Sequence, residues 1–434
     1  MFVRVATFLR SDASLAMITR ATQGGAMGVA ALFVIWHTSP TDQGFYFAFI
    51  SFGILLQLCD FGLSYAGLQS ASHLLATDAI GALPALAALA LRINAAVTGL
   101  ACVVVATLGW MVFARTPGDA VVAWAAPWLA FVVGVSLNHL TAPYLFLVEG
   151  GVSVTRAWRF RLLQEILSGS ALLTVLALGE GLWALVAYYA TRGVLGGLLM
   201  RRVPFGPARG GAFTLRRWRD ELWPFQWRVG MSAVSAYLVF QAFGPILFAL
   251  RGPIEAGRFS LSLSMMNALV MVTTAWPISQ AAHFGILLGR RQGRDLALRW
   301  NRLVLQSTAF AAVGALTMIV VFLALRELAP DVMTRFAGPT TTGLLIASAV
   351  VHHVVACIAV VVRSERRDPL LVVGVVGGLV TLGLMTAAAL RDELTWIALA
   401  YLLCTSATLP IAYAIYRRFA VRQRGADGNI VSTA

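Results

Sequence analysis

The residues that decide the fold read GFYFAFISFGILLQLCDFGLS, from Gly44 to Ser64. This stretch is apolar and aromatic almost throughout, and Asp60 is its one charged residue. A helix of about 20 apolar residues is long enough to cross the hydrocarbon core of a bilayer, which is roughly 30 Å thick. The stretch therefore predicts a membrane-spanning helix.

Similar apolar stretches recur along the whole chain. Of the 434 residues, 59% are hydrophobic and 12% are charged, and the mean hydropathy is +0.80. A soluble protein of this size needs more polar surface, so the composition predicts an all-α, polytopic membrane protein. We place about twelve transmembrane helices, at roughly 14–36, 44–68, 93–114, 121–147, 163–178, 181–200, 230–250, 257–283, 303–325, 341–362, 370–390 and 394–416.

The connections between these spans alternate between arginine-rich and arginine-poor. The chain has 33 basic residues, and every one of them is an arginine. One set of connections carries about 25 arginines and the other about 6, and the positive-inside rule assigns the rich set to the cytoplasm. We therefore predict a multi-pass protein of the bacterial inner membrane with both termini in the cytoplasm.

Several function classes are disfavoured. The net charge of +14 is spread over loops between spans instead of forming one basic face, so we expect no nucleic-acid partner. The cysteines lie far apart within apolar stretches, which predicts neither disulfides nor a metal site. No nucleotide-binding loop or nucleophile motif is present, so we expect neither an enzyme nor a cofactor. The cysteines are Cys59, Cys102, Cys357 and Cys404.

A polar connection at 201–229 divides the spans into two groups of six. We predict an N-terminal six-helix lobe at 1–200, a cytoplasmic linker at 201–229 and a C-terminal lobe with a short tail at 230–434. A repeated pattern supports the division. The second helix of each half opens with the same pattern, which is an acid, a glycine two residues later and an aromatic residue two beyond that. In the first half these are Asp42, Gly44 and Tyr46, and in the second half they are Glu255, Gly257 and Phe259.

The stretch from Gly44 to Ser64 resembles the second helix of polysaccharide transporters of the multidrug/oligosaccharidyl-lipid/polysaccharide (MOP) flippase superfamily, which includes O-antigen flippases. Phe61 stands here in place of the usual leucine. In the second half, Gly257-Arg-Phe259 followed by Trp276-Pro277 resembles the corresponding family segment. The resemblance implies a MATE-like fold of two six-helix lobes around a central cavity, which exports a lipid-linked saccharide by alternating access.

A charged side chain inside a membrane span costs free energy, so each one needs an oppositely charged or polar partner or an aqueous surface. Arg20 and Asp60 stand about equally far from the turn near Pro40, and we predict that they meet, with Gln23 and Gln57 forming a second polar rung beside them. Two roles stay open. Arg20, with Gln23 and Gln57, could bind the pyrophosphate-linked substrate while Asp60 orients Arg20 or couples an ion, or the pair of Arg20 and Asp60 could only join two helices.

Glu165 and Arg192 repeat this geometry on the fifth and sixth spans. Glu165 is a candidate for ion coupling or helix pairing, and Arg192 for binding substrate at the cavity or for anchoring at the interface. The adjacent histidines His352 and His353 point about 100° apart on a helix, so we predict packing or a polar cavity wall instead of a metal site.

Together these patterns predict a flippase or exporter that moves a polyprenyl-pyrophosphate-linked oligosaccharide. Its partners would be that lipid-linked substrate, the membrane lipids and a coupling ion, either a proton or sodium. One alternative is an ion-coupled multidrug antiporter of the same fold, which predicts that acids dominate the cavity. Another is an integral-membrane saccharide polymerase or ligase, which needs long catalytic loops on the outer face, whereas every predicted outer connection is short.

Overall fold

The computed structural model describes residues 12–77, 79–116, 122–202, 213–290, 292–364, 369–391 and 393–431. In these ranges every regular element is a helix, as the sequence predicted. Eleven of the described helical segments are long and apolar enough to cross a membrane. The chain is therefore a multi-pass membrane protein. Residues 203–212 of the predicted linker lie outside the described residues.

The chain forms two compact units. Unit 1 is Met1–Tyr237 together with Gly252–Gly257, and unit 2 is Leu238–Arg251 together with Arg258–Ala434. The chain therefore crosses from one unit to the other three times between Tyr237 and Arg258.

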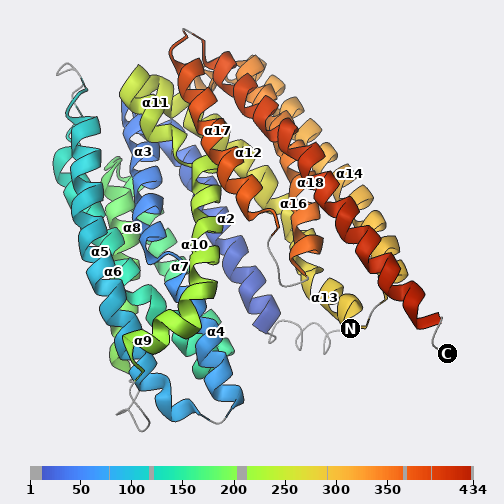
Figure 1. Cartoon of the computed structure of the whole chain (residues 1–434). Helices are drawn as coiled ribbons and strands as arrows, with labels where there is room; N and C mark the ends of the chain where they lie inside the picture. The colour runs from blue at the N-terminus through green and yellow to red at the C-terminus, as the bar shows by residue number, and fades with distance from the viewer. Residues whose placement is uncertain are drawn as a thin grey trace, which may run out of the picture. The chain divides into compact units, whose positions relative to one another are not determined.

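In unit 1, α6 is the helix around which the others pack. It contacts α3, α4, α5, α7 and α8, whereas α2 packs mainly on α7 (Figure 1). The helices are α2 (Asp12–His37), α3 (Pro40–Gln57), η1 (Leu58–Asp60), α4 (Leu63–Ala76), η2 (Ile80–Ala82), α5 (Leu83–Phe113), α6 (Ala125–Gly151), α7 (Val154–Ala177), α8 (Trp183–Arg202), α9 (Leu215–Arg217), η3 (Trp218–Leu222) and α10 (Trp223–Phe240).

In unit 2, α18 packs along α14, α16 and α17. The helices of this half are α11 (Phe243–Arg251), α12 (Pro253–Ser279), α13 (Ala281–Gly289), α14 (Gly293–Leu328), α15 (Pro330–Met333), α16 (Pro339–Arg363), α17 (Leu371–Ala389) and α18 (Leu394–Val431). The helix α12 begins in unit 1 and continues in unit 2.

Three of the predicted spans contain a break, namely 44–68, 230–250 and 257–283, the last of them at Gln280 between α12 and α13. The first breaks between Asp60 and Leu63, where Phe61 and Gly62 adopt left-handed backbone conformations. The second breaks between Phe240 and Phe243. Pro245 accounts for this second break, because a proline ring clashes with the carbonyl group four residues earlier.

The repeated sequence pattern marks two helix starts of the same kind. Ser39 caps α3, since its Oγ accepts the Asp42 N–H (3.0 Å) and the Asp42 carboxylate accepts the Ser39 N–H (3.2 Å). Pro40 follows as the first helical residue. The helix α12 likewise begins with a proline, Pro253, and has an acid, Glu255, in its first turn. Prolines and acids are both favoured at helix N-termini, which explains why the pattern recurs.

The glycines of the two patterns contact each other within unit 1. A Cβ atom on Gly257 would lie 2.8 Å from the Gly44 nitrogen, and one on Gly44 would lie 2.0 Å from the Pro253 carbonyl oxygen. Only glycine allows backbones to approach this closely. The repeat is therefore also a helix crossing, in which the start of each half's second helix packs against the other.

Aromatic side chains form the core between α3, α5 and α6. Phe49 is fully buried, and its ring centroid lies 5.2 Å from that of Phe113, 4.9 Å from that of Trp128 and 5.4 Å from that of Phe131. These are favourable separations for aromatic pairs. The core fixes α3, and with it the position of the break at Asp60.

Candidate functional site

Arg20 and Gln23 lie on α2, the first described helix of unit 1, and both side chains are exposed. The helix packs on α7 and contacts α3 only weakly. Among the described residues Arg20 takes part in no ion pair. The predicted contact between Arg20 and Asp60 is therefore wrong, because the first helix turns its packing face to the fifth span and not to the second.

Asp60 stabilises the break in its own span. Its Oδ1 accepts the N–H of Gly62 at 2.8 Å, and its Oδ2 accepts the N–H of Ser64 at 3.2 Å. These amides belong to the start of α4, where backbone donors have no partner within the helix. The carboxylate thus caps α4 and lets the chain continue after Phe61 and Gly62.

The break packs closely against α10. A Cβ atom on Gly230 would lie 2.5 Å from Phe61 Cγ, and one on Gly62 would lie 2.8 Å from the Gln226 carbonyl oxygen. The Phe61 ring also stacks on Trp223, with the ring centroids 6.2 Å apart. Phe61 is therefore the side chain that joins the broken second span to the seventh.

Gln57 pairs with the sixth span and not with Gln23. Its Nε2 donates to the Gly53 carbonyl at 3.2 Å and to the Tyr189 hydroxyl at 3.4 Å. The helix α3 packs on α6, beside α8, so its polar residue meets a partner from α8. The predicted polar rung of Gln23 and Gln57 is not formed.

Glu165 and Arg192 do meet, as their spacing from the turn predicted. The Arg192 Nη1 forms an ion pair with the Glu165 Oε1, and the side chains are only 17% and 5% exposed. Tyr188 completes the group, since its hydroxyl donates to Glu165 Oε2 at 3.1 Å and its ring lies 5.3 Å from the Arg192 Cζ. Burial of an ionised carboxylate is tolerable here because an opposite charge and a hydroxyl both contact it.

The sequence analysis did not identify several residues that make polar contacts in or near this group. Tyr188 lies one helical turn before Arg192, and Gln164, next to Glu165, donates to the Arg192 carbonyl at 2.8 Å. A second partly buried ion pair joins Arg161 to Glu149 at 2.5 Å, with the guanidinium 4.6 Å from the Trp158 ring. The spacing of four residues between Tyr188 and Arg192 was a usable signal, because it places both side chains on one face.

Unit 2 holds a neutral polar cluster. His353 Nε2 lies 3.1 Å from Ser307 Oγ and 3.4 Å from Cys357 Sγ, so α14 and α16 are joined by hydrogen bonds without charge. His352 points elsewhere, with its ring 4.8 Å from that of Phe240. Within the described parts of the chain no group of three or more metal-ligating side chains is found.

The fold resembles that of solved transporters. No protein-family model matches the chain, and neither does any curated protein. An inward-facing multidrug resistance MATE family transporter of the MOP superfamily matches with a TM-score of 0.66 and 10% identity, over 94% of this chain and 99% of that one.

Two further structures extend the likeness. The eukaryotic MATE transporter AtDTX14 matches with a TM-score of 0.59 and 13% identity, over 96% of this chain and 99% of that chain. A MOP superfamily transporter from Pyrococcus furiosus matches with a TM-score of 0.55 and 14% identity, over 96% of each chain. At such identities the likeness concerns the fold, and it confirms the MATE-like fold that the sequence predicted.

Proposed function

We propose that this protein exports a polyprenyl-pyrophosphate-linked oligosaccharide across the bacterial inner membrane by alternating access. The MATE-like fold supports a transporter, because the solved structures that share it are described as transporters. The anionic cargo is supported by the charges of unit 1. The arginine-rich loops support a loading side in the cytoplasm, where such lipid-linked precursors would meet arginines that attract their phosphates.

One observation carries the choice of cargo, namely which charged groups in the first lobe are already occupied. Asp60 is engaged by backbone amides and Glu165 by Arg192 and Tyr188. Arg20, by contrast, is exposed and has no ion-pair partner among the described residues. A guanidinium offers paired donors that match pyrophosphate oxygens, so we assign Arg20, with Gln23 one turn away, to the head group.

The other predicted site residues have supporting roles in this proposal. Arg192 and Glu165 hold α7 against α8 and so keep the packing partner of α2 in place. Gln57 joins α3 to α8 through Tyr189. Asp60 maintains the break in the second span, which gives the lobe a joint at which its cytoplasmic part can pivot.

A multidrug antiporter is the second candidate, because one solved structure of similar fold is a multidrug resistance transporter. It requires an acid that can bind a cation, and the two acids predicted within spans of the first lobe, Asp60 and Glu165, are engaged. The Pyrococcus furiosus transporter is described as having a binding pocket of reversed polarity that suggests a different function. The fold can thus serve cargoes of more than one charge, and the charge of the site decides between them.

Transport by the purified full chain in proteoliposomes tests the proposal. The cargo is a short polyprenyl-pyrophosphate-linked oligosaccharide, and its flipping is measured by the access of an added glycosidase. We expect Arg20→Gln to slow flipping about tenfold, as the loss of a charge-assisted hydrogen bond predicts, and Arg20→Lys to slow it less.

Arg326→Gln is the matched control, since Arg326 is also an exposed arginine on a long helix and lies near the C-terminal end of α14. We expect this variant to flip the cargo at the wild-type rate. A wild-type rate in Arg20→Gln, or efflux of a cationic dye driven by a proton or sodium gradient in place of flipping, would favour the antiporter.

A further inference from the structure

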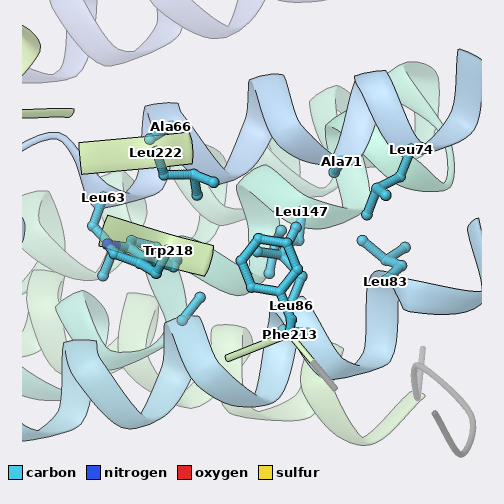
Figure 2. Packing of buried hydrophobic residues seen from close by; sticks show 12 residues of the cluster. Leu63, Ala66, Ala71, Leu74, Leu83, Leu86, Leu147, Phe213, Trp218 and Leu222 are labelled. Carbon is cyan, nitrogen blue, oxygen red and sulfur yellow. The ribbon is translucent and has the colours of Figure 1, made fainter. Parts of the chain in front are cut away.

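A groove in unit 1 lies between α4 and the segment from Phe213 to Phe225. Its floor is a buried apolar cluster of α4, α5 and this segment, and Figure 2 shows Phe213, Trp218 and Leu222 lying among the leucines of those helices. The cluster holds the segment against α4, so the groove is a fixed feature of unit 1. Its volume is about 360 Å³, which is in the range of sites for small molecules.

The walls of the groove are of two kinds. Leu74, Phe213 and Phe225 supply apolar surface, whereas Gln69, Ser70, His73, Arg217 and Glu221 supply polar groups. An amphiphile with a polar head and an apolar tail fits such a lining better than a free ion does. Arg217 is the strongest recognition element, because it carries a fixed positive charge.

The guanidinium of Arg217 is already oriented. Its Nε donates to both carboxylate oxygens of Glu221, at 2.9 and 3.0 Å, and its Cζ lies 4.8 Å from the Phe213 ring centroid. Among the described residues, neither Nη1 nor Nη2 of Arg217 has a hydrogen-bond partner. The two terminal amino groups are therefore held side by side and available, which is the arrangement that binds two oxygens of one phosphate.

An exposed aromatic residue adjoins the groove. The side chain of Tyr65 is 44% exposed, and its ring centroid lies 5.9 Å from that of Phe225, which lines the groove. Tyrosine and tryptophan concentrate at the depth of lipid head groups, where one side of the ring meets acyl chains. The apolar rim therefore favours a lipid over a soluble phosphate.

We propose that this groove binds an anionic phospholipid of the cytoplasmic leaflet, with the lipid phosphate on Arg217 and an acyl chain along Phe225 and Tyr65. The proposal rests on the cytoplasmic orientation proposed above and not on the cargo. Because the groove is bounded by both α4 and the start of the seventh span, a bound lipid would also hold together the two elements that meet at Phe61.

Native mass spectrometry of the purified full chain tests this proposal directly. Phosphatidylglycerol and phosphatidylcholine are added separately, inorganic phosphate is then added to the lipid-bound protein, and the retained lipid adducts are counted. We expect wild-type protein to retain phosphatidylglycerol well above phosphatidylcholine, and Arg217→Gln to retain about tenfold less, the effect of one lost charged contact. Inorganic phosphate at millimolar concentration should not displace the lipid.

The matched control is Arg216→Gln. Arg216 is the neighbouring residue of the same short helix, is 86% exposed and pairs with an acid four residues later, as Arg217 does, but does not line the groove. We expect it to retain phosphatidylglycerol like the wild type. Ser70→Leu, which fills the groove and leaves Arg217 in place, should lose retention as Arg217→Gln does.

Three results would overturn the assignment. Equal losses in Arg216→Gln and Arg217→Gln would mean diffuse attraction to a basic surface, and equal retention of the two lipids would remove the role of the charge. Displacement by inorganic phosphate would mean a soluble anion site. None of these measurements involves transport, so they stand apart from the test of Arg20.

Discussion

The buried polar groups of the two units differ in kind. In unit 1 an ion pair and a tyrosine hydroxyl join α7 to α8, through Arg192, Glu165 and Tyr188. In unit 2, α14 and α16 are joined by neutral hydrogen bonds among Ser307, His353 and Cys357. Within the described residues, both ion pairs with mostly buried side chains belong to unit 1.

This difference separates two ways of joining helices. A neutral cluster loses little if one member is removed, because the group left behind can be accommodated at modest cost. A buried ion pair loses much more, since the remaining charge has no counter-ion. Unit 1 therefore depends on its polar interior more strongly than unit 2 does, and substitutions can measure this.

The largest expected effect is that of Arg192→Leu. It leaves Glu165, 5% exposed, without its cation, and we expect the free energy of unfolding to fall by about 3 kcal/mol or more. Denaturant titration of the detergent-solubilised protein, followed by tryptophan fluorescence, measures this. The double variant Arg192→Leu with Glu165→Leu should recover most of the loss, because no unpaired charge remains. A double variant as unstable as the single one would mean that shape, not charge, dominates.

The glycine crossing comes next, and it concerns the feature that both halves share. In Gly44→Ala the new Cβ would meet the Pro253 backbone, and we expect a loss of about 1 to 3 kcal/mol from the forced separation. Gly99→Ala in α5 is the control, since a Cβ there has nothing within 4 Å, and it should leave stability unchanged or raise it by up to about 1 kcal/mol. Equal effects of the two substitutions would rule out the close crossing.

Ser307→Ala probes the neutral cluster of unit 2. The His353 Nε2 keeps its contact with Cys357, so we expect a loss of about 1 kcal/mol, the usual net contribution of a neutral hydrogen bond. The same denaturant titration applies. If Ser307→Ala were as costly as Arg192→Leu, the two interiors would not differ in the way proposed.

The smallest effect is expected at Asp60. Asparagine keeps one acceptor oxygen, which can accept the N–H of Gly62, but its amino group cannot accept that of Ser64, so Asp60→Asn should cost about 0.5 kcal/mol. Asp60→Ala removes the cap and should cost about 1 kcal/mol. Thermal unfolding of the two variants side by side distinguishes capping from charge, and equal losses would mean that the negative charge itself is needed.

The sequence predicted the class of fold because spans depend on composition. Each span is recognised from its own residues, without knowledge of its neighbours. The backbone conformation and the contacts of residues inside a span were harder to predict. The break at Phe61 and Gly62 lies in an apolar stretch that hydropathy treats as continuous, and the left-handed backbone there depends on the Asp60 cap and on the packing of Gly230.

Of the three contacts predicted for the candidate site, one is formed, that between Glu165 and Arg192. Glu165 and Arg192 lie on successive helices joined by a short turn, so their depths, counted from that turn, were enough to pair them. The same count failed for Arg20 and Asp60, although those helices are also successive. Depth is set by the chain, but whether two faces meet is set by helix rotation, and α2 is rotated toward α7.

The sequence alone determined that this chain crosses the membrane many times, and it predicts that the arginines gather on one side and that the interior charges lie in the first half. These properties follow from the number and order of apolar residues, because each residue type prefers water or lipid according to its own polarity. Only the tertiary structure decided which helix each polar group contacts. That choice depends on packing between helices far apart in sequence, as when α10 closes on Phe61, and no local pattern specifies it.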